Sequence, residues 1–205
     1  LWSNLLNNWM TNNGYFVNPH DPCLYTKWTD PDGPIHVCAH VDDIGIVATR
    51  AQCDAFFTLF SNAKTGFSLT RHGALGRECK RYLGIEVERT DTEFILSNEH
   101  LIKGLLDKVG EQIKQYPAEE VAMRDLRLSN EDAVRDPKER ERQGLDRKPF
   151  RSYLGGLGYI MLSTRPDLAY SYKELARFNT IYGKEHWDAL MRTISYLNKT
   201  KDTHK

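Results

Sequence analysis

The hydrophobic pattern changes period along the chain and predicts both helices and strands. Apolar residues recur at helical spacing from Trp2 to Trp9, over residues 51–63 and over residues 97–109, where Ser97 and Gly110 mark the two ends. Short apolar runs bounded by turn residues predict two groups of strands, over residues 24–28, 35–41 and 44–48 and over residues 82–88 and 94–96. The pattern therefore predicts a chain of the α+β class.

The second half of the chain changes character twice. From Glu111 to Lys148 half of the residues are charged and apolar periodicity is weak, so we expect a linker or a solvated insertion. Helical periodicity then returns, first around Tyr153 and Leu157 and again from Trp187 to Leu197. We therefore expect three segments: residues 1–110, 111–148 and 149–205.

The composition is that of an ordinary globular protein. Hydrophobic residues make up 40% of the chain and charged residues 27%, with a formal net charge of zero. No apolar run approaches the roughly 20 residues of a transmembrane helix and no signal segment opens the chain, so we expect an intracellular protein, in a cytoplasmic particle or the nucleus, with no membrane partner. The helix that begins at Trp2 has no preceding cap, which favours a fragment of a longer chain.

The cysteines and histidines do not predict a zinc site or a disulfide framework. The chain has no Cys-x-x-Cys pair and no histidines at zinc-finger spacing, so reduced, buried thiols are expected at Cys23, Cys38, Cys53 and Cys79. His36 and His40 are four residues apart on one predicted strand and could join Asp42 as metal ligands. Zinc would need a further ligand and supporting contacts that the sequence does not supply.

Two adjacent aspartates are the most informative feature of the sequence. Asp42 and Asp43 interrupt the apolar run between two predicted strands, which places both carboxylates at the tip of a hairpin. At a tight turn both side chains can reach one cation, and paired carboxylates are hard oxygen ligands suited to Mg²⁺. The pair therefore indicates a candidate magnesium site.

The alternative interpretation is that the two aspartates only form the turn, because aspartate is common in turns. However, two-residue hairpins favour Asn-Gly or Asp-Gly, and two neighbouring negative charges repel each other. Asp42-Asp43 is thus an unfavourable choice for a purely structural turn, and such a departure favours a functional role.

Short motifs along nearly the whole chain resemble the reverse transcriptase of copia-type retrotransposons. They follow the opening helix in this order: Gly14-Tyr15-Phe16, Asp21-Pro22-Cys23-Leu24-Tyr25, Val41-Asp42-Asp43-Ile44, Leu75-Gly76, Tyr82-Leu83-Gly84-Ile85-Glu86-Val87, Leu96-Ser97, Tyr153-Leu154-Gly155, Thr164-Arg165-Pro166-Asp167-Leu168-Ala169 and His186-Trp187. Each motif is short, but their joint order is specific.

The resemblance implies a fold, an activity and a set of partners. It implies a partial polymerase palm, an antiparallel sheet with packed helices, and the start of a thumb in residues 1–110, followed by a mostly helical connection region leading toward an RNase H domain. It also implies that Asp42 and Asp43 are catalytic and hold two Mg²⁺ ions while the primer 3′-hydroxyl attacks the nucleotide α-phosphate. The implied partners are an RNA or DNA template-primer and dNTPs.

The chain departs from the family pattern at two positions beside the aspartates. His40 stands where the family usually has tyrosine. The resemblance implies that this position helps to place the primer or the nucleotide, and the change to histidine puts that role in question. Gly45 replaces an apolar residue, which weakens a strand interior. The third metal-binding aspartate of the family lies upstream of this sequence, so the isolated chain is not expected to polymerise.

Basic residues near the predicted palm are candidates for nucleic-acid binding. The stretch from Lys64 to Arg81 is locally basic although the total charge is zero, and it could follow phosphates or form an ordinary solvated face. The candidates are Lys64, Arg71, Lys80, Arg81 and Lys103.

Two further interpretations remain. In the Thr164-Arg165-Pro166-Asp167 motif, Pro166 and Asp167 suit a helix start and Arg165 can pair locally, which favours a structural role. For the whole chain, the alternative to a polymerase fragment is a non-catalytic, degenerate transposon remnant that at most binds nucleic acid or a protein partner.

Overall fold

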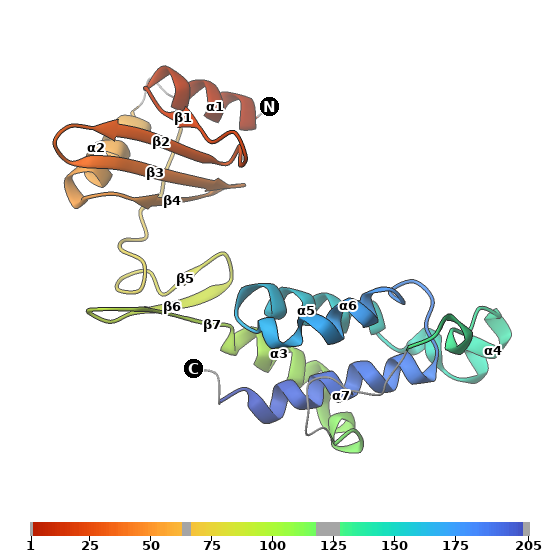
Figure 1. The fold of residues 1–205 in the computed structure, drawn as a ribbon. Coiled ribbons are helices and arrows are strands. Elements are labelled where there is room, and N and C mark those ends of the chain that lie inside the picture. Colours follow the sequence, from red (N-terminus) through yellow and green to blue (C-terminus); the bar gives the residue numbers. More distant parts are fainter. Residues whose placement is uncertain (1, 63–66, 118–127, 203–205) are drawn as a thin grey trace. The chain divides into compact units, whose positions relative to one another are not determined.

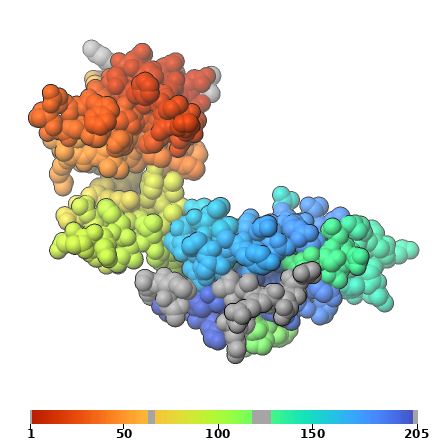
Figure 2. Space-filling model, in the orientation of Figure 1, coloured from red at the N-terminus to blue at the C-terminus, as the bar shows by residue number. Residues whose placement is uncertain are grey.

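The computed structural model describes residues 2–62, 67–117 and 128–202, and these fall into two compact units, Leu1–His72 and Gly73–Lys205 (Figure 1). In the space-filling view the first unit is coloured red to pale orange and the second yellow-green to blue (Figure 2). The boundary at residue 72 differs from the predicted one at residue 110, so the compact units and the three segments expected from the sequence have different limits.

The first unit combines a four-stranded sheet with two helices. Its strands follow one another as an antiparallel meander in the order β1-β2-β3-β4. The three strands predicted from the sequence and both predicted helices are confirmed. The elements are α1 (Trp2–Asn12), β1 (Phe16–Val17), β2 (Leu24–Thr29), β3 (Gly33–His40), β4 (Asp43–Val47) and α2 (Arg50–Phe60).

One face of this sheet holds the core of the unit. Ile35, Val37 and Ala39 alternate along β3 and are buried, as expected for side chains two residues apart on a strand. They belong to one cluster with Met10 of α1 and Phe60 of α2, neither of which has measurable exposure. Burial of these apolar side chains, with the ones larger than alanine each contributing roughly 1.5–3 kcal/mol, holds both helices on this face.

The other face of the sheet is open. Its side chains, by strand register, include the even-numbered residues of β3 and their partners on the neighbouring strands. Among them, Phe16, Trp28 and Val47 are each more than 70% exposed. The same face carries Asp43, so the aspartate pair lies at one end of an uncovered sheet surface.

A separate three-stranded sheet opens the second unit, with β5 (Arg81–Tyr82), β6 (Ile85–Arg89) and β7 (Phe94–Ser97) in antiparallel order. Residues 82–88 were expected to form one strand, and this prediction is wrong at Leu83 and Gly84. Both residues have positive φ, 48° and 75°, and they form the two-residue turn between β5 and β6. The hairpin joining β6 and β7 is confirmed.

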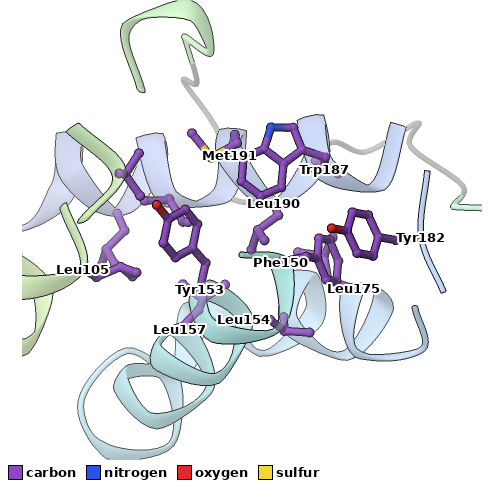
Figure 3. Close-up of a cluster of buried hydrophobic side chains, with 14 of the residues drawn as sticks. Leu105, Phe150, Tyr153, Leu154, Leu157, Leu175, Tyr182, Trp187, Leu190 and Met191 are labelled. Carbon is purple, nitrogen blue, oxygen red and sulfur yellow. The ribbon is translucent and has the colours of Figure 1, made fainter. Parts of the chain in front are cut away.

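Helices make up the rest of the second unit and bury a large common core. The longer ones pack on one another, and their buried faces include Leu157, Leu190 and Met191, whose side chains have no exposure (Figure 3). The helical periodicities predicted around Tyr153 and Trp187 are confirmed. The helices are α3 (Glu99–Val109), α5 (Phe150–Ser163), α6 (Ala169–Ala176) and α7 (Lys184–Thr200), with 3₁₀ turns η1 (Gly110–Gln115) and η4 (Pro166–Leu168).

The charged stretch before α5 is more ordered than expected. It contains η2 (Asn130–Asp132), α4 (Pro137–Arg142) and η3 (Leu145–Arg147), and Leu145 is fully buried in the helical core. The hydroxyl of Tyr182 shares its one proton between the carbonyl oxygens of Leu145, at 2.6 Å, and Lys148, at 2.9 Å. The described parts of this stretch are therefore packed against the helices, which differs from a purely solvated linker; residues 118–127 lie outside the described part.

All four thiols are less buried than the sequence analysis expected. All four cysteines are free, but Cys23 and Cys38 are exposed and Cys53 and Cys79 are half-buried, so the prediction of buried thiols is wrong. Cys38 shares the open sheet face with His36 and His40 because it alternates with the buried residues of β3.

None of the helices in the described part combines the length and apolar character that a membrane crossing requires.

Candidate metal centre

The aspartate pair lies at the tip of the β3–β4 hairpin, as predicted. His40 and Asp43 form the last registered pair of the two strands, so Val41 and Asp42 are the two loop residues. Val41 has a φ of 51°, while Asp42 is not among the residues with positive φ. A positive φ at only the first loop position is the pattern of a type II′ turn, where glycine is usual.

The tip stores backbone strain at Val41. Left-handed φ values are rare for β-branched side chains and cost roughly 1–3 kcal/mol, so neighbouring contacts must hold the conformation. One such contact comes from α1, where the indole nitrogen of Trp2 donates a hydrogen bond of 2.9 Å to the Val41 carbonyl. Trp2 also packs edge-on against Phe67, with ring centroids 5.4 Å apart. Nothing in the sequence signals this contact beyond the apolar face of the first helix.

Both carboxylates of the pair are exposed to solvent. Asp43 projects from the open face at the start of β4, and Asp42 belongs to the loop. Within the described chain neither carboxylate makes a hydrogen bond or an ion pair, so their mutual repulsion is not offset by a nearby cation. Two unpaired, adjacent oxygen donors on a fixed turn could bind a hard divalent cation that keeps part of its water shell.

The histidines near the tip do not complete a cluster with the aspartates. His40 lies across from Asp43, but His36 is four residues from His40, which is about 13 Å along a strand. His36 instead shares a hydrogen bond of 3.0 Å between its Nδ1 and the Thr26 hydroxyl. Over the described residues, no group of three His, Cys, Asp or Glu side chains could hold a metal ion. A zinc site built on both histidines is therefore not formed.

The basic candidates belong to different units, and most contact groups of their own unit. Arg71 pairs with Asp54 at 2.5 Å, Lys80 donates to the Gly76 carbonyl at 3.2 Å, and Arg81 pairs with Glu86 at 3.3 Å. The two ion pairs are solvent-accessible, so each contributes little to stability. Lys103 lies on the exposed side of α3, and Lys64 falls outside the described residues. Nucleic-acid binding by these residues stays a prediction.

Arg165 takes the structural role that its motif favours. Its guanidinium is 3% exposed and forms a two-point interaction with Asp167, at 2.9 Å and 2.7 Å, while Nη2 also donates to the Thr200 hydroxyl at 2.7 Å. The interaction links the start of η4 to the end of α7. Arg165 and Asp167 therefore stabilise the helical core and are not part of the candidate metal centre.

Comparison with known proteins gives distant relatives and no structural neighbour. The chain matches no family model, and no solved structure is significantly similar. It is 28% identical over 201 residues, 97% of its length, to the retrovirus-related Pol polyprotein from transposon TNT 1-94 of Nicotiana tabacum. It is 26% identical over 200 residues to the retrovirus-related Pol polyprotein from transposon RE1 of Arabidopsis thaliana.

A yeast protein extends the same pattern. The putative transposon Ty5-1 protein YCL074W of Saccharomyces cerevisiae is 23% identical over 202 residues. The matches cover 14% of the Nicotiana polyprotein, 12% of the Arabidopsis polyprotein and 60% of the yeast protein. Along nearly its whole length, the chain is therefore similar to a short part of the Pol polyproteins of transposons.

Proposed function

We propose that the chain is part of a transposon reverse transcriptase, an RNA-directed DNA polymerase in which Asp42 and Asp43 are metal-binding catalytic residues. The observation that carries this proposal is the β3–β4 tip, where a strained turn presents two exposed and unpaired carboxylates at the end of an open sheet face. Similarity to retrovirus-related Pol polyproteins supports it. In this proposal residues 1–110 contribute to the palm and the start of the thumb, and residues 149–205 to a helical connection.

The donor chemistry of the pair fits magnesium. Mg²⁺ prefers oxygen ligands and is commonly bound through one or two carboxylates together with water and substrate phosphates. Bound between enzyme and nucleotide, the ion would neutralise charge that develops during nucleotidyl transfer. Asp42 and Asp43 would hold it at the tip, and His40, across from Asp43, would border the primer terminus or the incoming nucleotide.

The proposal requires a further carboxylate from another part of the polyprotein. The described chain offers two carboxylates at the tip and no third ligand beside them. In the described sheet β4 pairs only with β3, so the outer edge of β4 has unpaired backbone groups next to Asp43. We propose that an additional strand pairs with this edge and brings the missing ligand.

Primer extension on an RNA template with Mg²⁺ tests the proposal. Three proteins are compared: this chain, a chain lengthened upstream with polyprotein sequence, and the longer chain with Asp42→Asn and Asp43→Asn. We expect extension only by the longer chain with both aspartates, and a decrease of about two orders of magnitude or more in the variant, because the metal ion that these aspartates would hold acts directly on the reacting phosphate.

The matched control is a second acidic turn of the same unit. Asp30 and Asp32 are exposed in the β2–β3 turn, so Asp30→Asn with Asp32→Asn removes the same charge at another hairpin. This control should extend primers at the rate of the unchanged longer chain. If none of the folded proteins extends a primer, the non-catalytic remnant is the better interpretation.

A further inference from the structure

His186, from the His186-Trp187 motif, is fully buried at the start of α7, and both nitrogens of its ring contact the backbone. Nδ1 lies 3.0 Å from the Gly183 amide nitrogen, and Nε2 lies 3.1 Å from the Ser129 carbonyl oxygen. An amide N–H can only donate and a carbonyl oxygen can only accept, so Nδ1 must be the acceptor and Nε2 must carry the proton. The two contacts therefore require a neutral ring in one tautomer.

The contact with Ser129 joins the start of α7 to the segment of residues 128–134, which includes η2. The two backbones approach closely here, because a Cβ atom at Gly183 would overlap the Asp132 carbonyl oxygen. The carboxylate of Asp132 also accepts a hydrogen bond of 3.3 Å from the Ser129 amide, which closes the segment into a compact turn. His186 thus links this turn to the helix on which it packs.

A second link between the segment and the residues before α7 does not depend on a titrating group. The guanidinium of Arg140 donates through Nη1 to the carbonyl oxygens of Val134, at 3.1 Å, and Tyr182, at 3.2 Å. Arginine keeps its charge throughout the pH range in which histidine titrates. The segment therefore has one link that requires a neutral histidine and one that acid leaves intact.

Protonation of the His186 ring is incompatible with the first link. A proton added at Nδ1 would point at the Gly183 amide, so two donors would meet without an acceptor between them. The new positive charge would also be buried against the ring of Phe178, whose centroid is 3.9 Å from that of the imidazole. The charged form of the ring therefore favours an open segment, in which water can reach both nitrogens.

The charges around the ring do not compensate for its burial. Burial lowers the pKa of His186, whereas Asp132, the hydrogen bond to the backbone carbonyl and Glu185 act in the opposite direction. Of the cations nearby, Lys184 lies two residues earlier on α7, and Arg177 lies 5.3 Å from the centroid of the aromatic ring that contacts His186. Each of these cations pairs with a carboxylate of its own helix.

We propose that His186 is an acid-sensitive latch, whose neutral ring holds residues 128–134 on the start of α7 and whose protonation releases this segment while the helical core stays folded. The released side chain takes up a proton below the ordinary histidine pKa of about 6.5, and the held ring resists it. The free energy that holds the segment is therefore complete above that pH and decreases as the pH falls below it. The core persists because the apolar contacts between α5 and α7 involve no titrating group. The latch does not use Asp42 or Asp43, so it is independent of polymerase activity.

Amide hydrogen exchange on the full chain, at about pH 7.5 and about pH 5, tests the latch on either side of the ordinary histidine pKa. Rates are expressed relative to those of an unfolded peptide at the same pH. We expect the protection of residues 128–134 and of the Gly183 amide to fall about tenfold on acidification, because release is coupled to the uptake of one proton. The interior amides of α7 should keep their protection.

His186→Gln is the decisive variant. Glutamine at the third position of a helix can accept the same backbone N–H in a capping box and can donate to a carbonyl, but it has no titrating group. The protection of the segment should then be equal at both pH values, whatever its level. The matched control is His100→Gln, which removes another histidine of the second unit, beside Glu86, and should leave the tenfold decrease in place.

Two further measurements apply even if His186→Gln fails to fold. Imidazole ¹⁵N shifts of the unchanged chain should show the proton on Nε2 at neutral pH. Arg140→Gln should lower the protection of the segment by a similar factor at both pH values, because it removes the link that acid leaves intact.

Four results would overturn the proposal. They are an unchanged protection of residues 128–134 in acid, a decrease that persists in His186→Gln, an opening of α7 by the same factor as the segment, and a neutral ring that carries its proton on Nδ1. An effect of Arg140→Gln at acid pH alone would also count against it.

Discussion

The β3–β4 turn of the first unit and the β5–β6 turn of the second are both two-residue hairpin loops with a bulky first residue. Val41 and Leu83 have φ values of 51° and 48°, a region that such side chains rarely adopt. In each case a helix supplies an aromatic hydrogen-bond donor to the carbonyl of that residue: Trp2 of α1 donates to Val41, and the Tyr159 hydroxyl of α5 donates to Leu83. Both turns are therefore held by a side chain from a neighbouring helix.

The two turns differ at the second position. Gly84 has a φ of 75°, which glycine adopts at little cost, whereas Asp42 occupies the corresponding place in the first unit and is followed by another aspartate. Glycine suits the second position of the β5–β6 turn because φ is positive there, whereas Asp42 has no positive φ and needs no glycine. In the proposed function the two carboxylates at the β3–β4 tip serve metal binding and not the turn.

The largest expected effect concerns metal binding by the first turn. Asp43→Asn should lower the affinity for Mn²⁺, used as a probe for Mg²⁺, at least about tenfold, because one of two charged ligands is lost. Paramagnetic broadening of the amide signals around His40 and Asp43 measures this. Asp30→Asn with Asp32→Asn should leave the broadening in place, and equal loss in both variants would contradict a specific site.

The second turn should be sensitive to its glycine. Gly84→Ala forces a side chain into the left-handed region and should lower the free energy of unfolding of the second unit by about 1–2 kcal/mol. Urea unfolding followed through Trp187, the only tryptophan of that unit, measures the loss. Gly104→Ala, at a helical position with open space around it, should instead be neutral or stabilising by up to about 1 kcal/mol. A neutral Gly84→Ala would contradict the strained-turn description.

Removing the two aromatic donors should have similar, smaller effects. Trp2→Phe and Tyr159→Phe each delete one hydrogen bond to a turn carbonyl and should lower the free energy of unfolding of their own unit by about 1 kcal/mol. Hydrogen exchange of the turn amides should accelerate in the affected hairpin only. Acceleration spread over the whole unit would show that the aromatic ring, and not its donor, holds the turn.

The smallest expected effect is at Val41. Val41→Gly relieves the unfavourable φ, but glycine also loses more chain entropy on folding, so we expect a stabilisation of about 0.5 kcal/mol. Val41 is 69% exposed, so few contacts are lost. The matched change Leu83→Gly removes a half-buried side chain and should not stabilise its unit. Urea midpoints of both variants measure the difference. Destabilisation by Val41→Gly would contradict the description of Val41 as a strained residue.

Periodicity predicted the long elements well because burial is their cause. The helices around Trp187 and Tyr153, and the hairpin that carries the aspartates, follow directly from apolar spacing. The β5–β6 turn was missed because Leu83 continues the apolar run, and nothing local marks its positive φ apart from the glycine that follows. The aspartate pair was visible as a motif, whereas Trp2 and Val41 are 39 positions apart and only the fold brings them together.

The misplaced thiols show what a simple alternation rule could have added. Cys38 lies between Val37 and Ala39, which are buried, so its side chain must point to the opposite face of β3. Residue type alone favours a buried cysteine, and strand parity outweighs that preference here. The packing of Leu145 was missed because its many charged neighbours weaken the apolar periodicity on which the prediction rests.

In both sheets the order of the strands in space is their order along the chain. Every strand therefore pairs with a neighbour in sequence, which keeps loop-closure entropy low and favours rapid folding. During synthesis each hairpin can close as soon as its second strand leaves the ribosome, without waiting for distant residues. The helical core around α7 can be completed only after this seventeen-residue helix has been made, since α7 contacts segments made much earlier.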